Sequence, residues 1–488
     1  MKVSSFLTSV SGLGLAQTGV LQGVPSSGAN IGDGYSAQAE TPRISTLPLV
    51  RHSSARFGEL DDLGGWNDEG RHRRPRKKLK QQQSGSSITH VDGIDVRYRS
   101  KKSGVQDLVA NDRLVRVWHP EIDEKARLAM MNLTKYPDIW PYISVMPDFH
   151  VGESNVNGTV IPTMNTLYVN AIGGDIGCGM ACMRLPLSLS DIESVQQQLF
   201  KEIHARVPVG RRVNIRYDER VDGKSFFQTD LEIMNKANTQ RAKQSLGTLG
   251  SGNHFIEVQV TELGEVYVMV HTGSRMLGQN VRKAGIQRGH NAQQPRGLVT
   301  MAADSEEGKE YLRNAEYAVQ YATENRREIL YQVFLAFQAL VPQMSDVSFD
   351  SLMAEYIDTP HNFISREEHF GRQLYVHRKG AVYVPKGELS IIPGSMGSYS
   401  HIVRGKGNRF SFHSSSHGAG RALTRHQALS RISYEEYLAE MEGIACRQDR
   451  NILDEARGAY KDISQVMRHQ RDLVSIYETL YPFVVVKG

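Results

Sequence analysis

Gly173-Gly174-Asp175-Ile176-Gly177-Cys178-Gly179-Met180 is the most informative stretch of this sequence. Its glycines let the backbone turn tightly and approach a ligand closely. Asp175 supplies a hard oxygen and Cys178 a soft sulfur within one turn, and both atom types are metal ligands. Taken alone, the stretch has a second interpretation, a glycine-rich turn around an inert buried cysteine. The segments that follow it favour the metal site.

Three histidines lie in comparable surroundings further along the chain, at His254, His271 and His361. His254 follows a glycine loop and begins a strand-like run, whereas His271 ends the run 266–270 where a loop opens, a usual place for functional side chains. With Asp175 and Cys178 they offer carboxylate, thiolate and imidazole ligands. Such a set suits two metal ions a few ångströms apart that are bridged by the thiolate. Each histidine alone is more typical of a structural role, so the prediction depends on the whole set.

The strand that begins near His254 also predicts a second kind of contact. With a period of two, Asn253, Phe255 and Glu257 share one face of the strand, and His254 lies on the other. The side chains of Asn253 and Glu257 are therefore expected to face one ligand together.

His417 differs from the other histidines because Gly418, Ala419 and Gly420 follow it. These small residues leave room for a bulky group beside the imidazole, and Arg421 can contact a phosphate bidentately. A neutral imidazole can act as a nucleophile as well as a base. The alternative is a histidine that packs on its own loop at a helix start. The segment 391–398, Ile-Ile-Pro-Gly-Ser-Met-Gly-Ser, has the composition of a phosphate-binding loop.

The composition indicates a soluble globular protein. Hydrophobic residues make up 40% of the 488 residues and charged residues 23%, and the net charge of +5 is too small to indicate nucleic-acid binding by itself. Three cysteines are too few for a disulfide framework, which favours a reducing compartment, and we expect a cytoplasmic protein. No apolar run is long enough to span a membrane, and the N-terminus has too little positive charge for a signal peptide.

The chain pattern predicts an N-terminal extension followed by one large domain. Residues 1–88 have the composition of a disordered segment and contain a basic run at 71–80, which is either a phosphate-binding tail or a solvated linker. From residue 89 onward we expect an α+β fold with central β-sheets flanked by α-helices. Helices are predicted at 121–133, 191–206, 226–244, 306–340 and 434–445, strands at 94–98, 111–118, 160–172, 266–270 and 482–486, and a hairpin at 374–384.

An ordered series of motifs resembles the RtcB family of RNA-splicing ligases. The motifs are GGDIGCGM, LGTLGSGNHFIEVQ, VHTGSRMLG, HNF, HRKGA, PGSMGS, HGAGR and the terminal VVVKG. The resemblance covers roughly residues 90–488 and implies a single catalytic domain. It also implies a GTP- and Mn²⁺-dependent ligase that joins an RNA 3′-phosphate, or a 2′,3′-cyclic phosphate opened by water, to a 5′-hydroxyl. Transfer-RNA splicing and RNA repair both present such ends, and the family also suggests an activating protein as partner.

The resemblance assigns roles to residues of this chain. Asp175, Cys178 and His254 would bind one Mn²⁺, and Cys178, His271 and His361 the other. His417 would carry GMP covalently, and Arg275 would bind the RNA end. The remaining contacts to GTP or GMP are expected from Asn253, Glu257, His361, Ser395, Met396, Ser400, Gly418, Ala419, Gly420, Tyr460 and Lys487. Asp148, in a Pro-Asp-x-His motif, is expected to support the metals or to bind RNA.

Two departures from the family pattern leave alternatives open. After Pro147-Asp148-Phe149-His150 the family commonly has a glycine-rich, often basic loop, whereas this chain has acidic and amide side chains at 153–157. The extension 1–88 also lies outside the pattern. A two-metal phosphodiesterase or phosphatase, or a protein that binds RNA ends without turnover, are therefore the alternatives to the ligase.

Overall fold

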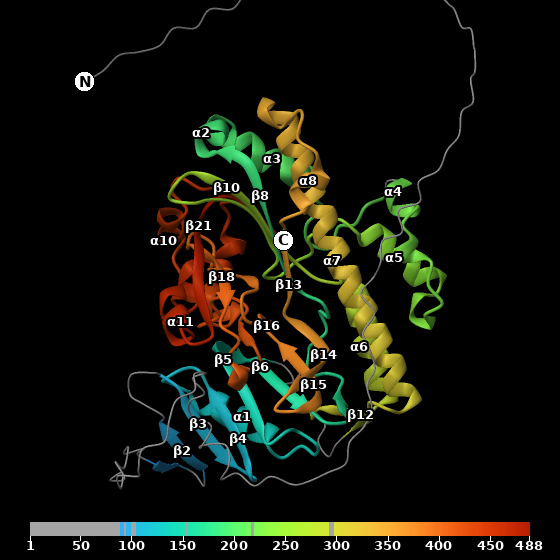
Figure 1. The fold of residues 1–488 in the computed structure, drawn as a ribbon. Coiled ribbons are helices and arrows are strands. Elements are labelled where there is room, and N and C mark those ends of the chain that lie inside the picture. Colours follow the sequence, from blue (N-terminus) through green and yellow to red (C-terminus); the bar gives the residue numbers. More distant parts are fainter. Residues whose placement is uncertain (1–87, 92–93, 99–103, 153–154, 216–218, 292–296) are drawn as a thin grey trace, which may run out of the picture. The chain divides into compact units, whose positions relative to one another are not determined.

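The structure is a computed structural model and describes residues 88–91, 94–98, 104–152, 155–215, 219–291 and 297–488 (Figure 1). The predicted N-terminal extension up to residue 87, with its basic run, lies outside the described residues, as do Glu153 and Ser154. The described residues belong to the compact unit 82–488. They form an α+β fold, as the sequence predicts.

The first sheet carries the N-terminal part of this unit. Its strands, in order across the sheet, are β1 (Ile88–Val91), β2 (Ile94–Tyr98), β3 (Gln106–Ala110), β4 (Arg113–Val117), β5 (Tyr142–Val151), β6 (Val156–Thr163), β15 (Arg372–Lys379) and β14 (Asn362–His369). Asn111 and Asp112 form the two-residue turn between β3 and β4 and both have positive φ, at 51° and 55°. Asn and Asp tolerate this conformation, so the chain reverses there and the predicted strand at 111–118 begins only at Arg113.

The second sheet carries most of the predicted site residues. Its strands, in order, are β13 (Ile357–Pro360), β8 (Gly179–Ser188), β10 (Glu265–Thr272), β9 (Phe255–Val260), β21 (Val474–Lys487), β18 (Ser400–Gly405) and β17 (Leu389–Ile392), and β20 (Ala445–Cys446) pairs with β21. Two smaller sheets consist of β11 (His290–Asn291), β12 (Val299–Ala302) and β7 (Thr166–Tyr168), and of β16 (Ala381–Tyr383) and β19 (Ser414–Ser416).

Helices cover these sheets. They are α1 (Glu124–Leu133), α2 (Leu189–Ile192), α3 (Gln196–Arg206), α4 (Glu219–Asp222), α5 (Lys236–Ser245), α6 (Met276–Arg288), α7 (Glu306–Leu340), α8 (Phe349–Met353), α9 (Arg425–Arg431), α10 (Tyr434–Glu440) and α11 (Ile463–His469). Short 3₁₀ turns link several of them.

The long helix α7 connects two hydrophobic cores (Figure 1). Its side-chain cap at Ser305 accepts a hydrogen bond from the N–H of Gly308, and Pro342 follows its last turn. Tyr311 and Ala318 in its first half pack with β7, β12 and α6. Val333 and Phe337 in its second half pack with α3 and the second sheet. One helix therefore supports both ends of the region that contains the site residues.

The predicted helices at 121–133 and 306–340 are confirmed within a few residues, and 434–445 is helical as far as Glu440. The helix predicted at 191–206 divides into α2, a 3₁₀ turn and α3. The predicted strand at 482–486 is the end of the longer β21. Two further predictions are wrong in part. The helix at 226–244 exists only as α5 after two 3₁₀ turns, and the strand at 160–172 divides into β6 and β7, followed by a turn.

The predicted hairpin at 374–384 is wrong because its two strands have different partners. β15 pairs with β14 and β6, whereas β16 pairs with β19. The hairpin in this region is β14–β15, which turns at Phe370 and Gly371, both with positive φ. The Arg378-Lys379-Gly380 segment has turn composition, but Gly380 only redirects the chain to another sheet.

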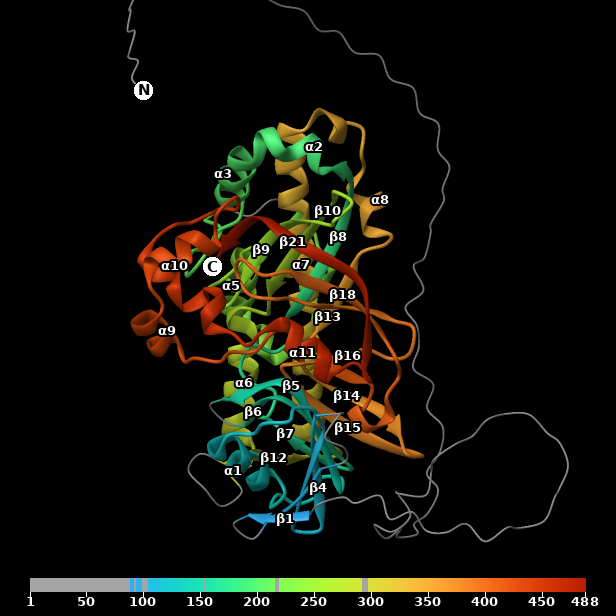
Figure 2. The same cartoon turned by 90° about the vertical axis from the view of Figure 1, so that its left-hand side faces the viewer.

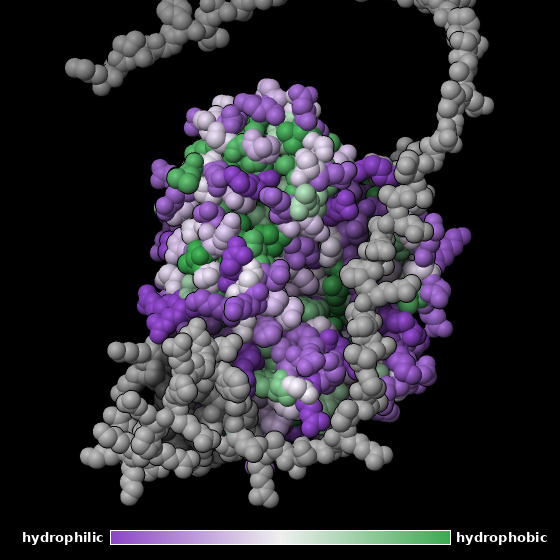
Figure 3. Space-filling model, viewed as in Figure 1, coloured by the Kyte–Doolittle hydropathy of each residue, from purple (hydrophilic) through white to green (hydrophobic). Residues whose placement is uncertain are grey.

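On the face drawn in Figure 3, apolar side chains occur in groups that polar side chains interrupt. Among the described helices, none is long and apolar enough to cross a membrane.

Candidate metal centre and nucleotide cavity

Strand pairing explains why ligands from distant parts of the sequence meet. In the second sheet, Gly179 at the start of β8 pairs with Thr272 at the end of β10 and with Pro360 at the end of β13. Phe255 at the start of β9 pairs with His271. Because neighbouring strands are antiparallel, these ends meet at one edge of the sheet. The residues at or next to these ends are Cys178, His254, His271 and His361.

The five predicted ligands form two overlapping groups, Asp175 with Cys178 and His254, and Cys178 with His271 and His361. Within each group one ligand atom per residue lies within 4.8 Å of the others. Sγ of Cys178 lies 3.5 Å from Nε2 of His254 and 3.2 Å from Nε2 of His271. The sulfur is common to both groups, as a bridging thiolate requires.

Two histidines turn Nε2 toward the other ligands because their Nδ1 atoms bond to the backbone. Nδ1 of His254 lies 2.9 Å from the carbonyl oxygen of Leu249, and Nδ1 of His271 lies 3.0 Å from that of Asn253. A carbonyl oxygen only accepts, so each Nδ1 carries a proton. Nε2 of His254 lies 3.0 Å from a carboxylate oxygen of Asp175, a contact that a shared proton or a bound cation satisfies. The carboxylate, thiol and imidazole groups of this cluster are a donor set that fits a metal ion.

The electrostatics of the buried ligands agree with this fit. Burial, together with the neighbouring histidines, holds the pKa of His271 and that of His361 well below the usual value. Burial and then the charge of Asp175 raise the pKa of the Cys178 thiol. Burial alone would also raise the pKa of Asp175, but the contact with His254 outweighs it and lowers that pKa. A metal ion reverses the effect on the thiol, because a coordinating thiol is deprotonated.

His417 is oriented by a buried carboxylate. Nδ1 of His417 lies 2.6 Å from Oδ2 of Asp148, and the backbone N–H of His417 donates to the same oxygen at 3.1 Å. Asp148 is fully buried at the end of β5. A proton shared at Nδ1 leaves Nε2 with its lone pair. The imidazole stands beside the metal-ligand cluster, with its ring centre 4.8 Å from that of His361.

Gly420 allows the segment after His417 to pass this close to β5. Its φ is +74°, and a Cβ atom there would lie 2.0 Å from the backbone oxygen of Asp148. Only glycine fits at this position.

Two buried charged groups also line the cavity, Glu257 near the start of β9 and Lys487 at the end of β21. Glu257 is 4% exposed and Lys487 is 6% exposed. Nε2 of Gln259 donates to Oε2 of Glu257 at 2.5 Å and to Oγ of Ser400 at 3.1 Å. Burial raises the pKa of Glu257 to about 7, although Lys487 and Gln259 lower it. This carboxyl group therefore changes its charge near neutral pH.

A second buried carboxylate, Glu455, organises the same part of the cavity. Its Oε2 lies 2.7 Å from Nζ of Lys487 and accepts a hydrogen bond from the Tyr460 hydroxyl at 2.6 Å. Its Oε1 contacts Arg421 at 3.2 Å and Arg425 at 2.7 Å. The sequence motifs did not point to Glu455, because the residue lies in a 3₁₀ segment without glycine or histidine. Arg421, for which a phosphate contact was expected, here contacts Glu455 and Tyr460.

Most of these groups line one cavity of ≈ 280 Å³, close to the size of small-molecule sites. Asn253, Phe255 and Glu257 line it together, as the period of two predicts. The other predicted residues that line it are Asp175, Cys178, His271, His361, Ser395, Met396, His417, Gly418, Ala419, Gly420, Tyr460 and Lys487.

Three predicted residues lie outside this lining. His254 reaches Cys178 and Asp175 from behind the cavity wall. Ser400 supports the phosphate-type loop, because its Oγ accepts hydrogen bonds from Gln259 and from the N–H of Gly394. Arg275 at the start of α6 donates to Oγ1 of Thr248 and to the carbonyl of Gly210, both at 3.2 Å. Its predicted contact with RNA stays a prediction.

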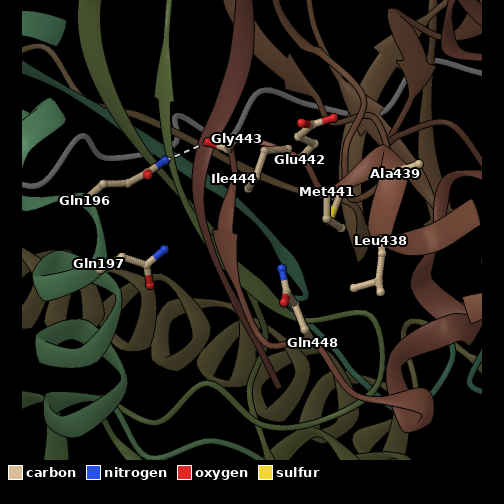
Figure 4. A pocket seen from close by; sticks show the side chains of 9 residues that line it. All are labelled: Gln196, Gln197, Leu438, Ala439, Met441, Glu442, Gly443, Ile444 and Gln448. Carbon is tan, nitrogen blue, oxygen red and sulfur yellow. Dashed lines mark hydrogen bonds between the residues drawn. The ribbon is translucent and has the colours of Figure 1, made fainter. Parts of the chain in front are cut away.

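A larger hollow of ≈ 510 Å³ lies between α3 and α10 and has a different character (Figure 4). The side chains drawn there include no histidine or cysteine and one acidic group, Glu442. Gln196 from α3 donates to the carbonyl of Gly443 at 2.8 Å across it. Size alone therefore does not mark the reactive site of this chain.

The middle of α7 holds the metal-site loops in place. Arg326 is fully buried and its Nε lies 2.6 Å from Oδ2 of Asp358, while Nη1 donates to the carbonyls of Gly177 and Thr272 at 2.8 and 3.1 Å. The neighbouring Asn325 accepts from the N–H of Gly247 at 2.8 Å. Neither residue stands out in the sequence, because polar residues at these positions are typical of the exposed face of an amphipathic helix.

In the segment 153–157, where the chain departs from the family pattern, the structure describes residues 155–157. The two amide side chains there, Asn155 and Asn157, bond inside the protein. Nδ2 of Asn157 lies 2.7 Å from Nε2 of His150, and Nδ2 of Asn155 donates to the carbonyl of Ala171 at 3.0 Å. Burial, helped by His417, lowers the pKa of His150 to about 4. His150 is therefore neutral beside the nucleophile candidate.

The model of the family "tRNA-splicing ligase RtcB" matches residues 129–488. The "RNA-splicing ligase RtcB" of Escherichia coli K12 is 35% identical over 407 residues, which cover 78% of this chain and 99% of that protein. The "tRNA-splicing ligase RtcB" of Thermococcus kodakarensis is 30% identical and covers 78% of this chain and 94% of its own length. The relative of the same name in Nanoarchaeum equitans is 29% identical, with 78% and 94% covered. With its strand-edge ligands and its histidine beside Asp148, this chain belongs to the RtcB family.

Proposed function

We propose that this protein is an RNA ligase that uses GTP and Mn²⁺ to join an RNA 3′-phosphate or 2′,3′-cyclic phosphate end to a 5′-hydroxyl end. The names of its relatives, which are RNA- and tRNA-splicing ligases, support an RNA substrate. Transfer-RNA splicing and RNA repair are the processes that supply such ends. We assign the activity to residues 89–488 as one catalytic domain, with an activating protein as a possible partner.

The arrangement of His417 carries this proposal. Its Nδ1 is bound to a buried carboxylate, its Nε2 keeps a lone pair, and the cavity that it lines also contains metal-type ligands and a buried carboxyl group, Glu257. A hydrolase needs an activated water, whereas this geometry provides an activated nitrogen nucleophile.

In the first step, Nε2 of His417 attacks the α-phosphorus of GTP. A P–N bond forms, the bond to the bridging oxygen breaks, and pyrophosphate leaves. An oxygen of the RNA 3′-phosphate next displaces the imidazole, so that GMP is joined to the RNA end. The 5′-hydroxyl then attacks the RNA phosphorus, its proton is lost, and GMP leaves as the phosphodiester forms. A cyclic phosphate end is first opened by water to the 3′-phosphate.

The metal ligands divide into Asp175, Cys178 and His254 for one Mn²⁺, and Cys178, His271 and His361 for the other. Two cations at these positions would neutralise the phosphates and the charge that develops on phosphorus. Asp148 orients His417 throughout and stabilises the proton at Nδ1.

The buried end of the cavity is assigned to guanine. The N1 and N2 hydrogens of guanine require an acceptor, and Glu257 provides a carboxylate there. Lys487 and Tyr460 border the base, and the phosphates and ribose lie toward Asn253, Ser395, Met396 and the Gly418–Gly420 segment. Ser400 acts by fixing the 394–400 loop.

Incubation of the purified protein with GTP labelled at the α-phosphate, with Mn²⁺, tests the first step on a denaturing gel. We expect label that stays on the protein and has the acid lability of a phosphoramidate. His417→Ala should lose it completely. The matched control is His426→Ala, which removes an exposed imidazole in α9 and should label like the wild type.

Label on His417→Ala would refute the assignment of the nucleophile. A wild-type protein that takes no label but hydrolyses cyclic phosphates would favour the two-metal phosphodiesterase. RNA-end binding without either activity would favour the non-catalytic alternative.

A further inference from the structure

A further hollow lies outside the nucleotide cavity and is lined by residues on or next to α11, β18 and β21. Figure 2 shows where these three elements lie. Its volume is ≈ 660 Å³. We call it the basic groove and define it by six of its lining residues, Tyr399, Lys406, Arg468, Arg471, Ile476 and Tyr481. None of them has a role in the proposed reaction.

Positive charge gathers along the basic groove. Lys406, Arg468 and Arg471 are exposed, and Arg404 stands next to them on β18. Among the described residues, no carboxylate lies within ion-pair distance of Arg404, Lys406 or Arg468. Arg404 and Arg468 donate instead to the carbonyl of Gly387 and to Oε1 of Gln465. Their charges are therefore available to a partner with negative charge.

Aromatic and apolar side chains are interleaved with these cations. Of the lining residues, Tyr481 is exposed by 36% and Ile476 by 52%, and the rings of Tyr399 and Tyr481 are 6.2 Å apart. The guanidinium of Arg404 lies 5.0 Å from the ring centre of Tyr477, and this exposed pair on β18 and β21 does not line the groove. Exposed rings among cations are the pattern on which single-stranded nucleic acids stack their bases.

Three segments of chain contribute residues both to the basic groove and to the nucleotide cavity. The loop before β18 contributes Ser395 to the cavity and Tyr399 to the groove. Strand β21 contributes Tyr481 to the groove and Lys487 to the cavity. Tyr460 lines the cavity, and α11, which begins three residues later, contributes Arg468 to the groove.

We propose that the basic groove binds single-stranded RNA adjacent to the end that is joined. Lys406, Arg468 and Arg471 contact the phosphates, and the rings of Tyr399 and Tyr481 support unpaired bases. The identity of the polymer as RNA rests on the proposed function, whereas the groove itself rests on the residues described here.

The test is fluorescence anisotropy of a labelled single-stranded RNA with a 3′-phosphate, measured with the full chain over a series of salt concentrations without GTP or metal. The double variant Arg468→Ala/Arg471→Ala should bind more weakly. The slope of log affinity against log salt should fall by about 1.4, since each phosphate contact on a single strand contributes about 0.7. Tyr481→Ala should weaken binding at least about fivefold with the slope unchanged, because a stacked base is lost.

The matched control is Arg313→Ala/Arg327→Ala, which removes the same charge from exposed positions on α7 and should leave the slope unchanged. Attachment of GMP from GTP does not involve RNA, so all variants should label like the wild type if they are folded. Equal slopes for the Arg468→Ala/Arg471→Ala variant and the control, or no RNA binding by the wild type, would overturn the proposal that the basic groove binds RNA. If the wild type took no label from GTP, the proposed function would be overturned. The anisotropy result alone would then decide whether the basic groove binds the RNA.

Discussion

Single carboxyl groups set the state of the two reactive ends of the cavity. Oδ2 of Asp148 lies 2.6 Å from Nδ1 of His417, and burial, Lys487 and Gln259 act on the charge of Glu257. Under the proposed function, the first carboxylate orients the nucleophile, and the protonation of the second carboxyl group decides whether it accepts hydrogen bonds. Both effects can be tested by changing one atom of a side chain.

Asp148→Asn replaces the carboxylate that binds Nδ1 of His417 with an amide of the same shape. We expect the rate of GMP attachment to fall by about 10²- to 10⁴-fold, because the imidazole loses the charge that orients it and stabilises its proton. Single-turnover labelling with GTP measures this rate. A rate equal to that of the wild type would show that the contact only supports the fold.

The pKa of Glu257 near 7 predicts pH-dependent selection of guanine. Below that pH the carboxyl group is protonated and accepts poorly from the N1 and N2 hydrogens of guanine, and above it the carboxylate accepts both. The preference for GTP over ATP in the labelling reaction should therefore rise as the pH passes upward through about 7. The ratio of the two KM values measures it, since the metals contact both triphosphates alike.

Glu257→Gln is the control for this profile, because an amide does not ionise in this range. Its GTP preference should be low at every pH. A wild-type ratio that stays flat across neutral pH would contradict the role of Glu257 in base recognition.

At the residue level, the sequence pointed to side chains that stand in glycine-rich motifs, such as Cys178, His254 and His417. The structure brings these together, but their chemical roles still need the experiments above. Glu455 was missed because it lies in a segment of ordinary composition, and Gln259 was given no role although it ends the motif LGTLGSGNHFIEVQ. Their importance depends on which neighbours the fold brings to them, and that is a long-range property.

At the level of elements, α7 contributes more than hydrophobic cover. The contacts of its middle turn reach the loop of Gly177 and the end of β10, so the helix determines where the metal ligands stand. Gly177 itself lies under α7, where a Cβ atom would approach Cα of Val319 to 2.7 Å. Helix and loop fit together only with glycine at this position.

Arg326→Met should lower the free energy of unfolding by about 3 kcal/mol, because Asp358 would stay partly buried without its partner. Urea unfolding of the variant and the wild type measures the difference. Arg327→Met is a matched control on the next residue, where the arginine is 44% exposed and 3.6 Å from the exposed Asp350. Its effect should stay within about 0.5 kcal/mol. Equal effects of the two substitutions would contradict the stabilising role of the buried pair of Arg326 and Asp358.

Elements with local signals were predictable, and elements with distant partners were not. The spacing of apolar residues at 306–340 predicts α7. The segment at 374–384 looked like a hairpin because Gly380 follows two cations, yet β16 pairs with β19 more than 30 residues later in the chain. No local pattern carries that pairing.

At the level of the whole molecule, metal binding joins segments that are far apart in sequence. Asp175 and Cys178, His254, His271 and His361 come from four separate segments around the edge of one sheet. Bound ions would therefore stabilise the folded chain against the unfolded chain, where no such site exists.

Addition of Mn²⁺ should raise the Tm of the wild type, and each site contributes about 2.7 kcal/mol when the metal is at about 100 times its Kd. Cys178→Ala should lose most of this rise, since the sulfur is common to both ligand groups. Cys182→Ala removes another buried thiol, from strand β8 that follows Cys178, and should retain the rise. Thermal unfolding with and without Mn²⁺ gives the change within each variant. A full rise in Cys178→Ala would refute the bridging sulfur.

The length of α7 as one unbroken helix limits how this enzyme can evolve. An α-helix turns by about 100° per residue, so one residue inserted before Asn325 would rotate the following half relative to the first by that angle. Arg326 would then point away from Gly177, and Phe337 would leave its core. Surface loops of this chain can change length. The rotation of α7 about its axis is fixed by the packing of its first half, by the contacts of Arg326 and by the packing of its second half, so its number of residues is fixed as well.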